Sequence, residues 1–361
     1  MKKILVVITT GFNPYGGLTT VMMNYWRAMD KTNLHFDFAC TNDPEKELLD
    51  EVCCAGCNYI KLPSRKNVLS YCKTLRKMSA KYDVAHIHGN SATSFLELAA
   101  LSKVPVRIVH NHNSITEHPF INAVLKPFFL KSYTQAVACS ELAGDWLFGK
   151  GQFKVLRNAI DVDRFKPNSE RRKQIRQLFG IADDEIVVGN VGKIIKQKNH
   201  SFIIDVFAEY RKINFKSKLL LIGTGNLEDA IKEKIVALGL QKFVVMAGLR
   251  TDIPDMMCAM DVFLFPSLWE GLPLAALEAQ ASGLPVFISS VISSEVCISE
   301  NCYVLSLEEK PSVWAKAIYE KANVGERTVF VERNEKSLAK AGYNIRNEAK
   351  ELRQLYNDKE Q

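Results

Sequence analysis

The sequence lacks any apolar run long enough to form a membrane-spanning helix, which needs about 18 consecutive apolar residues. Near the start, the apolar run Ile4–Ile8 ends at Thr9, so it is shorter than the apolar part of a signal peptide. We interpret this run as a first β-strand and expect a cytoplasmic protein. With 47% hydrophobic and 24% charged residues, the composition is that of a compact globular fold.

Features of disulfide-bonded and zinc-binding domains are also scarce. Nine cysteines is an odd number in a chain of 361 residues, which favours reduced thiols over a disulfide framework. Cys53, Cys54 and Cys57 include a C-x-x-C spacing, but no second pair follows to complete a four-ligand zinc site. We therefore interpret these residues as ordinary core or surface thiols.

Signatures of dinucleotide and nucleic-acid binding are missing. Neither Gly223-Thr-Gly225 nor the loop around Gly16-Gly17 has G-x-G-x-x-G spacing, and no helix-turn-helix, zinc finger or RNA-binding motif is found. The net charge of +7 lies wholly in the first part of the chain. Residues 1–160 hold 19 Lys and Arg against 12 Asp and Glu, whereas the remainder holds 28 of each. A basic first half favours an anionic partner other than nucleic acid, such as phospholipid or a phosphate-bearing substrate.

Two series of strand-like runs alternate with helix-like segments. The first series covers 4–8, 36–39, 84–87, 106–109 and 135–139, and the second covers 186–191, 218–222, 244–247, 262–265 and 286–288. Such alternation is typical of βαβ units in parallel sheets. We predict an α/β protein with two doubly wound, Rossmann-like parallel-sheet domains, residues 1–165 and 166–340. A charged helical stretch at 335–356 predicts a C-terminal helix within 341–361, which could cross back to the first domain.

The strongest motif runs from Pro266 to Val286 and predicts strand, loop, helix, turn and strand. Glu270 precedes the helix, and Glu278 lies on its apolar stripe, where a carboxylate needs partners such as the vicinal hydroxyls of a sugar. The alternative for Glu270 is a carboxylate that only interacts with the helix dipole, and the alternative for Glu278 is a buried structural acid. Exposed N–H groups at the start of this helix favour a negative or hydroxyl-rich ligand. The residues at that start are Gly271, Leu272, Pro273 and Leu274.

Two further loops have the composition of phosphate-binding segments. After a predicted strand, Gly192 allows a tight turn, and Lys193, Lys196 and Lys198 follow within a few positions. Their crowded charge is offset if a diphosphate lies among them, and a solvated basic loop is the alternative. Near the N-terminus, Gly16-Gly17 joins a strand to a helix and is a weaker candidate for phosphate or sugar approach.

Together these segments resemble the retaining glycosyltransferases of sequence family four, which have the GT-B architecture of two facing Rossmann-like domains with a cleft between them. The resemblance covers nearly the whole chain, and segments 107–113, 146–149 and 197–199 are similar to the bacterial capsule and exopolysaccharide branch. It implies transfer of a sugar from a nucleotide-diphosphate sugar, which we expect to be a UDP-sugar. The acceptor, lipid-linked or saccharide, would bind the N-terminal domain, and the donor would bind the C-terminal domain.

The resemblance also implies roles for single residues. Lys193 and Lys198 would neutralise the donor diphosphate in the loop that begins at Gly192. Glu278 would hold the ribose and Glu270 the transferred sugar. At position 193 the family usually has Arg, and a Lys keeps the charge but loses the bidentate fork.

In the N-terminal domain, the resemblance places His110 near the hydroxyls of the sugar and the amides of Gly16 and Gly17 near the distal phosphate. At position 199 the family often has Gly, where this chain has Asn199.

No metal or other cofactor is expected. The family transfers without a metal, so lysines and helix dipoles would stabilise the leaving diphosphate. Asp161-Val-Asp163 has the letters of a metal-binding D-x-D, but its place in the linker favours turn chemistry.

The pairs His86/His88 and His110/His112 end two predicted strands and could in principle meet around a metal. No carboxylate or cysteine ligand accompanies them at a useful spacing, so we interpret them as a polar wall on the acceptor side.

Other activities are open to the same fold. A nucleotide-sugar epimerase of GT-B-like fold would share the diphosphate site, and a non-catalytic nucleotide-sugar binder would share the pocket. We further predict that the basic N-terminal domain docks peripherally on the inner face of the membrane. The segments Val68–Lys81 and Pro119–Lys131 combine apolar and basic residues. The alternative is an amphipathic helix packed on its own sheet.

Overall fold

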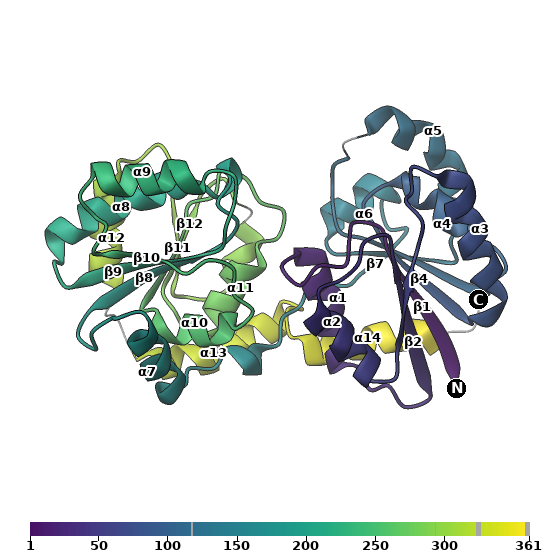
Figure 1. Cartoon of the computed structure of the whole chain (residues 1–361), viewed down its shortest axis with the longest axis horizontal. Coiled ribbons are helices and arrows are strands. Elements are labelled where there is room, and N and C mark those ends of the chain that lie inside the picture. The colour runs from purple at the N-terminus through teal and green to yellow at the C-terminus, as the bar shows by residue number, and fades with distance from the viewer. Residues whose placement is uncertain (117, 293, 323–325, 358–361) are drawn as a thin grey trace. The chain divides into compact units, whose positions relative to one another are not determined.

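The computed structural model describes residues 1–116, 118–292, 294–322 and 326–357. The chain divides into two compact units, Met1–Ala159 with Ile345–Gln361, and Ile160–Asn344. Each unit is a parallel sheet with helices on both faces, as Figure 1 shows. The predicted α/β class with two doubly wound sheets is therefore confirmed.

The sheet of the first unit has the strand order β3-β2-β1-β4-β5-β6-β7. Its strands are β1 (Lys2–Ile8), β2 (Leu34–Cys40), β3 (Asn58–Lys61), β4 (Val84–Gly89), β5 (Val106–Asn111), β6 (Gln135–Ala138) and β7 (Lys154–Val155). Its helices are α1 (Gly17–Ala28), α2 (Lys46–Cys54), α3 (Val68–Met78), α4 (Phe95–Ala100), α5 (Pro119–Phe129), α6 (Glu141–Leu147) and α14 (Ile345–Asn357), with 3-10 turns η1 (Ser79–Lys81) and η2 (Ala92–Ser94).

The sheet of the second unit has the strand order β10-β9-β8-β11-β12-β13. Its strands are β8 (Ile186–Val191), β9 (Ser217–Ile222), β10 (Val244–Met246), β11 (Val262–Phe265), β12 (Val286–Ser289) and β13 (Cys302–Leu305). Its helices are α7 (Ser169–Leu178), α8 (His200–Ile213), α9 (Glu228–Ala237), α10 (Ile253–Ala259), α11 (Leu274–Ala281), α12 (Pro311–Lys321) and α13 (Arg327–Lys340), with 3-10 turns η3 (Val162–Phe165), η4 (Lys196–Lys198) and η5 (Ser294–Val296).

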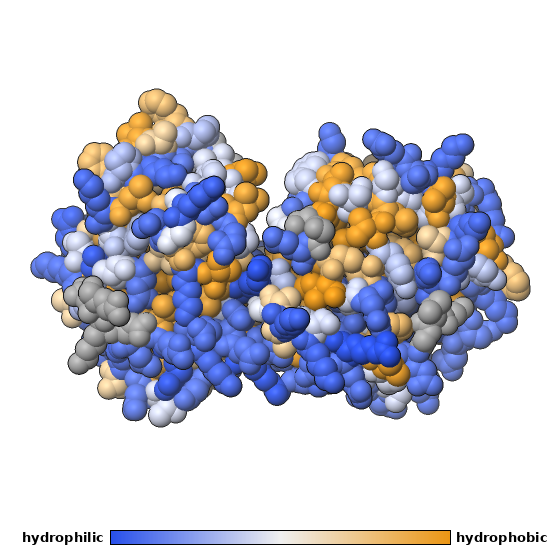
Figure 2. All heavy atoms as spheres, turned by 180° about the vertical axis from the view of Figure 1, so that it is seen from behind, coloured by the Kyte–Doolittle hydropathy of each residue, from blue (hydrophilic) through white to orange (hydrophobic). Residues whose placement is uncertain are grey.

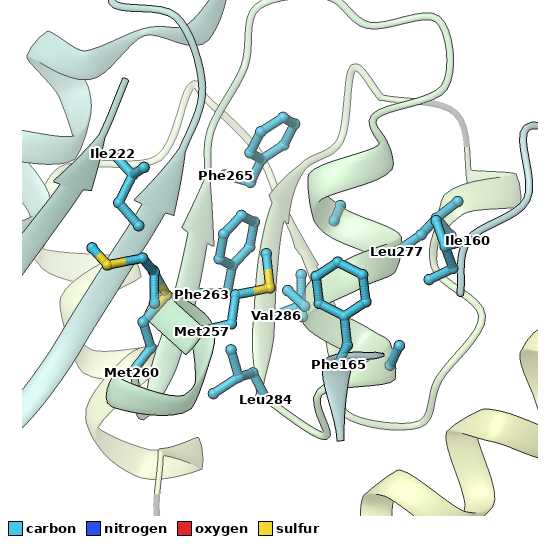
Figure 3. Packing of buried hydrophobic residues seen from close by; sticks show 14 of the residues in the cluster. Ile160, Phe165, Ile222, Met257, Met260, Phe263, Phe265, Leu277, Leu284 and Val286 are labelled. Carbon is cyan, nitrogen blue, oxygen red and sulfur yellow. The ribbon is translucent and has the colours of Figure 1, made fainter. Parts of the chain in front are cut away.

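Strand alternation divides the core of the second unit into two layers. On β11, Phe263 and Phe265 pack with α7, α10, α11 and α13, while Val262 and Leu264 pack with α8, α9 and α12. Figure 3 shows the first layer, in which Phe263 and Phe265 lie above Met257 and Val286. Both faces of the sheet are thus covered, which explains why its strands are continuous apolar runs without polar alternation.

The boundary between the units lies after Ala159, not near residue 165 as predicted from the turn-rich linker. Ile160 and Phe165 belong to the core of the second unit, where they pack in the same cluster as Leu277 (Figure 3). Ile160 also donates its backbone N–H to the carbonyl of Tyr343 over 3.0 Å. Apolar burial therefore assigns this part of the linker to the second unit.

The C-terminal stretch is not one continuous helix, as the pattern at 335–356 suggested. The helix α13 ends at Lys340, Gly342 turns the chain with φ +78°, and α14 begins at Ile345. The helix α14 belongs to the first unit, where the Tyr356 hydroxyl lies 2.7 Å from Nδ1 of His86. The glycine breaks the helix because it adopts a left-handed conformation that other residues rarely take.

The helix α3 does not offer its apolar stripe to a membrane. Tyr71 and Leu75 are fully buried against the sheet, so the packed-helix alternative is correct for this stripe, although Lys73, Arg76 and Lys77 remain exposed. Within the described residues, no helix is both long and apolar enough to cross a bilayer.

Candidate active site

The motifs found in the sequence follow the carboxyl ends of parallel strands in both units. In the second unit, the loop at Gly192 follows β8, Gly223 follows β9 and Pro266 follows β11. In the first unit, the glycine loop follows β1 and the histidine pairs end β4 and β5. This edge is where ligands bind in doubly wound sheets, so each unit has one candidate binding edge.

Gly223 and Gly225 bring two loops of the second unit into contact. A Cβ atom at Gly223 would lie 2.2 Å from the carbonyl oxygen of Gly192, and one at Gly225 would lie 2.2 Å from that of Ile194. The backbone N–H of Ile194 donates to the carbonyl of Thr224 over 2.9 Å. These glycines are therefore required for close packing of the lysine loop, a role that the sequence did not reveal.

The centre of the site is an ion pair between Lys198 and Glu270. Lys198 Nζ lies 2.6 Å from Oε1 of Glu270, and the two side chains are 17% and 7% exposed. The ammonium also lies 4.7 Å from the centre of the Phe265 ring. The structure thus brings together two predicted site residues that are far apart in the sequence, in surroundings that screen charge weakly.

Backbone contacts hold the two loops beside this pair. Leu268 donates its N–H to the carbonyl of Gln197 over 2.8 Å, and the Gln197 side chain donates to the carbonyl of Trp269 over 2.9 Å. Asn199 has φ +55° and ends η4 just before α8. Asparagine tolerates this left-handed conformation better than most residues, so its replacement of the family's glycine keeps the local geometry.

Lys193 and the start of α11 remain available to a ligand. Lys193 is exposed, and no ion pair reaches it within the described part of the chain. At Gly271, an added Cβ would meet no atom within 4 Å, so chain packing does not explain this glycine. Pro273 is the N-cap of α11 and makes no side-chain cap, which leaves the N–H groups of Leu274 and Ala275 without an intrahelical partner. Together these groups form an electropositive surface.

Glu278 lies in the second turn of α11 and is partly buried. Burial raises the pKa of its carboxyl to about 7, an effect that the positive charge of Arg164 partly offsets. Among the described residues, no hydrogen bond or ion pair to the carboxylate is found within the chain. A partly buried carboxylate of this kind is suited to accept hydrogen bonds from ligand hydroxyls.

The glycine loop of the first unit leaves the start of α1 uncapped. Gly16 occupies the N-cap position, where it provides no side-chain hydrogen bond, and α1 begins at Gly17. The loop is held by Asn42, whose side-chain oxygen accepts from the N–H of Phe12 over 2.7 Å. Free N–H groups in the first helical turn form a neutral surface with anion-binding geometry.

The structure changes the assignment of the histidines. His110 is fully buried, so it does not reach the surface where a sugar would bind. His112 follows the end of β5 and is partly exposed, with its Nδ1 3.3 Å from the Asn158 side-chain oxygen. Of the two, only His112 reaches the surface, and its Nε2 lies 2.9 Å from Nδ1 of His88. Strand alternation places the rings of His110 and His112 on the same face of the sheet, but only the end of the strand reaches the surface.

Both units match known glycosyltransferase families. Residues 185–322 match the family described as Glycosyl transferases group 1, and residues 15–164 match the one described as Glycosyltransferase Family 4. EpsF of Bacillus subtilis (strain 168), which carries the name of a glycosyltransferase, is 33% identical over 375 residues, 99% of this chain and 96% of that relative. The chain therefore belongs to the family four glycosyltransferases and is a glycosyltransferase.

Other similar proteins are named for capsular polysaccharide biosynthesis or for transfer from a UDP-sugar. The capsular polysaccharide biosynthesis glycosyltransferase CapH of Staphylococcus aureus is 26% identical, with 80% of this chain and 83% of CapH aligned. A UDP-Gal:alpha-D-GlcNAc-diphosphoundecaprenol alpha-1,3-galactosyltransferase of Escherichia coli is 30% identical, with 65% of this chain and 64% of that protein aligned. Among solved structures, HepE of Anabaena in complex with UDP and glucose has a TM-score of 0.80 and 18% identity, covering 99% of this chain and all of HepE, a likeness of fold.

The pKa of Glu278 generates a prediction about stability. Because the folded-state pKa of about 7 exceeds the ordinary 4.5, this group makes the folded protein less stable as the pH rises from 4.5 through 7. We expect Glu278→Gln to raise the melting temperature of the ligand-free protein above that of wild type near pH 8, and to have little effect near pH 5. Thermal unfolding followed across this range measures the difference.

The matched control is Glu233→Gln, since Glu233 is exposed on α9. This control should show no such dependence on pH. A difference between Glu278→Gln and wild type that stays constant from acid to alkaline pH would contradict the burial of an ionisable Glu278.

Proposed function

We propose that this glycosyltransferase moves a sugar from a UDP-sugar to a lipid-linked or saccharide acceptor during synthesis of exopolysaccharide, capsule or a related surface glycan. Transfer retains the anomeric configuration and uses no metal at the diphosphate. The observation that carries the proposal is the Lys198–Glu270 pair, 2.6 Å apart, beside the free start of α11. Family membership supports retention and favours transfer over the epimerase and over a non-catalytic binder.

The second unit binds the donor in this proposal. Negative charge grows on the UDP leaving group as the bond to the sugar breaks, and Lys198, Lys193 and the α11 N–H groups stabilise that charge. The position of Lys198 is set before the donor binds, because Glu270 already holds it. Support for UDP comes from two similar proteins, the Escherichia coli relative named for UDP-Gal and HepE with bound UDP.

The two carboxylates divide the recognition of hydroxyl groups. Glu278 accepts hydrogen bonds from the ribose, which provides the partners that its partly buried carboxylate lacks within the described chain. Glu270 accepts from hydroxyls of the transferred sugar, and Lys198 holds it in position. Gly271 leaves space for the sugar, since an added side chain there would meet only open surface.

The first unit binds the acceptor. His112 contacts sugar hydroxyls by exchanging its hydrogen bond to Asn158, and the α1 N–H groups beside Gly16 and Gly17 bind a phosphate of the acceptor. A lipid-linked acceptor is supported by the Escherichia coli relative, whose name contains diphosphoundecaprenol. Such an acceptor would place this unit at the inner face of the membrane.

Of the two predicted membrane contacts, the structure favours α5. Phe120, Ile121, Val124 and Phe128 on this helix are 79%, 47%, 52% and 58% exposed. Figure 2 shows apolar surface at the end of the unit where α5 lies. Lys131, just after the helix, is exposed and adds charge that attracts anionic headgroups. We propose that α5 inserts its apolar side chains into the headgroup region.

Replacing Lys198 should remove most of the activity. We expect Lys198→Ala to lower kcat by about 10²–10³-fold, equivalent to about 2.7–4 kcal/mol of lost transition-state stabilisation. Steady-state turnover of a UDP-sugar is measured together with the melting temperature, because the change leaves Glu270 without its partner. The matched control is Lys196→Ala, an exposed lysine in the same 3-10 turn, which should keep near wild-type turnover. Full turnover by a folded Lys198→Ala protein would refute the phosphate role.

Chelation should leave activity unchanged. In the proposed mechanism, the positive groups that face the diphosphate are side chains and backbone N–H groups, so excess EDTA removes nothing that transfer requires. Turnover is compared before and after addition of EDTA. A loss that Mg²⁺ or Mn²⁺ restores would contradict a metal-free mechanism.

The membrane contact is tested by sedimentation with lipid vesicles. We expect wild type to bind vesicles of phosphatidylglycerol and phosphatidylcholine at low salt, more weakly at high salt. The double change Phe120→Ser and Phe128→Ser should weaken binding at least about tenfold, since each buried phenylalanine contributes about 1.5–3 kcal/mol. Leu142→Ser, which alters an exposed leucine on α6, is the control and should bind as wild type does. If the Phe120/Phe128 double variant binds vesicles as strongly as Leu142→Ser does, α5 is excluded as the contact.

A further inference from the structure

The histidine pairs of the first unit meet in one buried cluster. His88 and His110 are register partners on β4 and β5, and His86 lies two residues before His88 on the same face. Ring centres are 4.2 Å apart for His86 and His88, 5.3 Å for His88 and His110, and 5.5 Å for His86 and His110. All three side chains are at most 3% exposed. The cluster lies directly below His112, the histidine assigned above to the acceptor, whose ring centre is 4.1 Å from that of His110.

The hydrogen bonds of this cluster are incomplete. Nδ1 of His86 lies 2.7 Å from the Tyr356 hydroxyl, and Nδ1 of His88 lies 2.9 Å from Nε2 of His112. In contrast, Nε2 of His86 is buried without a partner among the described residues, and the ring of His110 has only a backbone contact with Leu156. Unpaired buried polar atoms are uncommon in folded proteins, and several around one point indicate a missing ligand.

The chemistry of the side chains indicates what kind of ligand is missing. An imidazole nitrogen has a lone pair to share, and histidine is the commonest metal ligand in proteins. A cation that prefers nitrogen ligands would therefore be bound here.

We propose that His86, His88 and His110 bind one divalent transition-metal ion of the zinc type. One ligand nitrogen from each of the three residues lies within 4.8 Å of the other two. Around a tetrahedral ion with bonds of about 2.1 Å, nitrogens lie about 3.4 Å apart, a closure that small side-chain rotations supply. A cavity of about 10 Å³ borders His86 and His88 but not His110, and its other walls are mostly apolar.

The contacts around the three rings match those of metal-binding histidines. Such a histidine commonly has its other ring nitrogen held by a hydrogen bond, which fixes the orientation of the ring. Tyr356 on α14 has this position for His86, and His112 has it for His88. The ion would thus link β4 to β5 and, through Tyr356, to the C-terminal helix. The role of the ion is structural, so this proposal does not rest on the proposed transfer reaction. It revises the expectation that the chain binds no metal.

The test measures the metal content of full-length protein without a polyhistidine tag. Because the cluster is buried, the ion enters during folding, so protein is produced in zinc-supplemented medium or refolded with Zn²⁺. We expect about one zinc per chain by elemental analysis. Protein refolded with Co²⁺ should show the intense visible bands of a four-coordinate site. Zinc-free wild type with no cobalt bands would overturn the proposal and leave water as the occupant of the cavity.

Single substitutions locate the ion. His88→Asn and His110→Asn should lose the bound metal. His200→Asn is the matched control and should retain it, because His200 is 3% exposed with both ring nitrogens unpartnered but lies in the second unit. Equal zinc in His110→Asn and wild type would overturn the assignment.

Wild type alone provides a second test should the variants fail to fold. After refolding with Zn²⁺, its melting temperature should exceed that of protein refolded with Mg²⁺ or with chelator. Equal melting temperatures would count against the site. UDP binding by the same samples is the separate readout for the donor site, and we expect it in zinc-loaded and zinc-free protein alike.

Discussion

The ion pair between Lys198 and Glu270 joins two loops that are 72 residues apart in the sequence. Both side chains are largely buried, so removal of either one leaves the other charge without compensation in weakly screening surroundings. The loop after β8 is held by the loop after β9, where Gly223 and Gly225 have no room for a side chain, and by the loop after β11 through Leu268. The ion pair also orients the segment before α11. The geometry of the candidate donor site therefore depends on this one contact.

The two units provide different chemistry at the same edge of the same kind of sheet. In the second unit, the candidate site is charged, with exposed Lys193 and largely buried Lys198 and Glu270 around the start of a helix. In the first unit it is neutral, with His112 and the uncapped start of α1. A diphosphate needs positive charge, whereas sugar hydroxyls need polar groups that both donate and accept. The division of charged and neutral groups between the units matches a donor and an acceptor of these kinds.

Much of the fold was predictable from local patterns. Strands 186–191 and 262–265 match the structure at both ends, because fully covered parallel strands are unbroken apolar runs. The short strands β3, β7 and β13 were missed. They are two to four residues long and partly exposed, so their sequences show neither a long apolar run nor a clear alternation.

The sequence by itself determined which residues have the chemistry of a donor site, because turn glycines, clustered lysines and carboxylates beside a helix start are local features. The alternation of strand-like and helix-like runs is also a local feature, so the sequence determined the α/β class with two sheets as well. Only the tertiary structure decided that Lys198 meets Glu270, that His110 is buried while His112 is open, and that α3 buries its apolar stripe whereas α5 exposes its own. Burial and pairing between strands depend on contacts between residues far apart in the chain, and no local pattern contains that information.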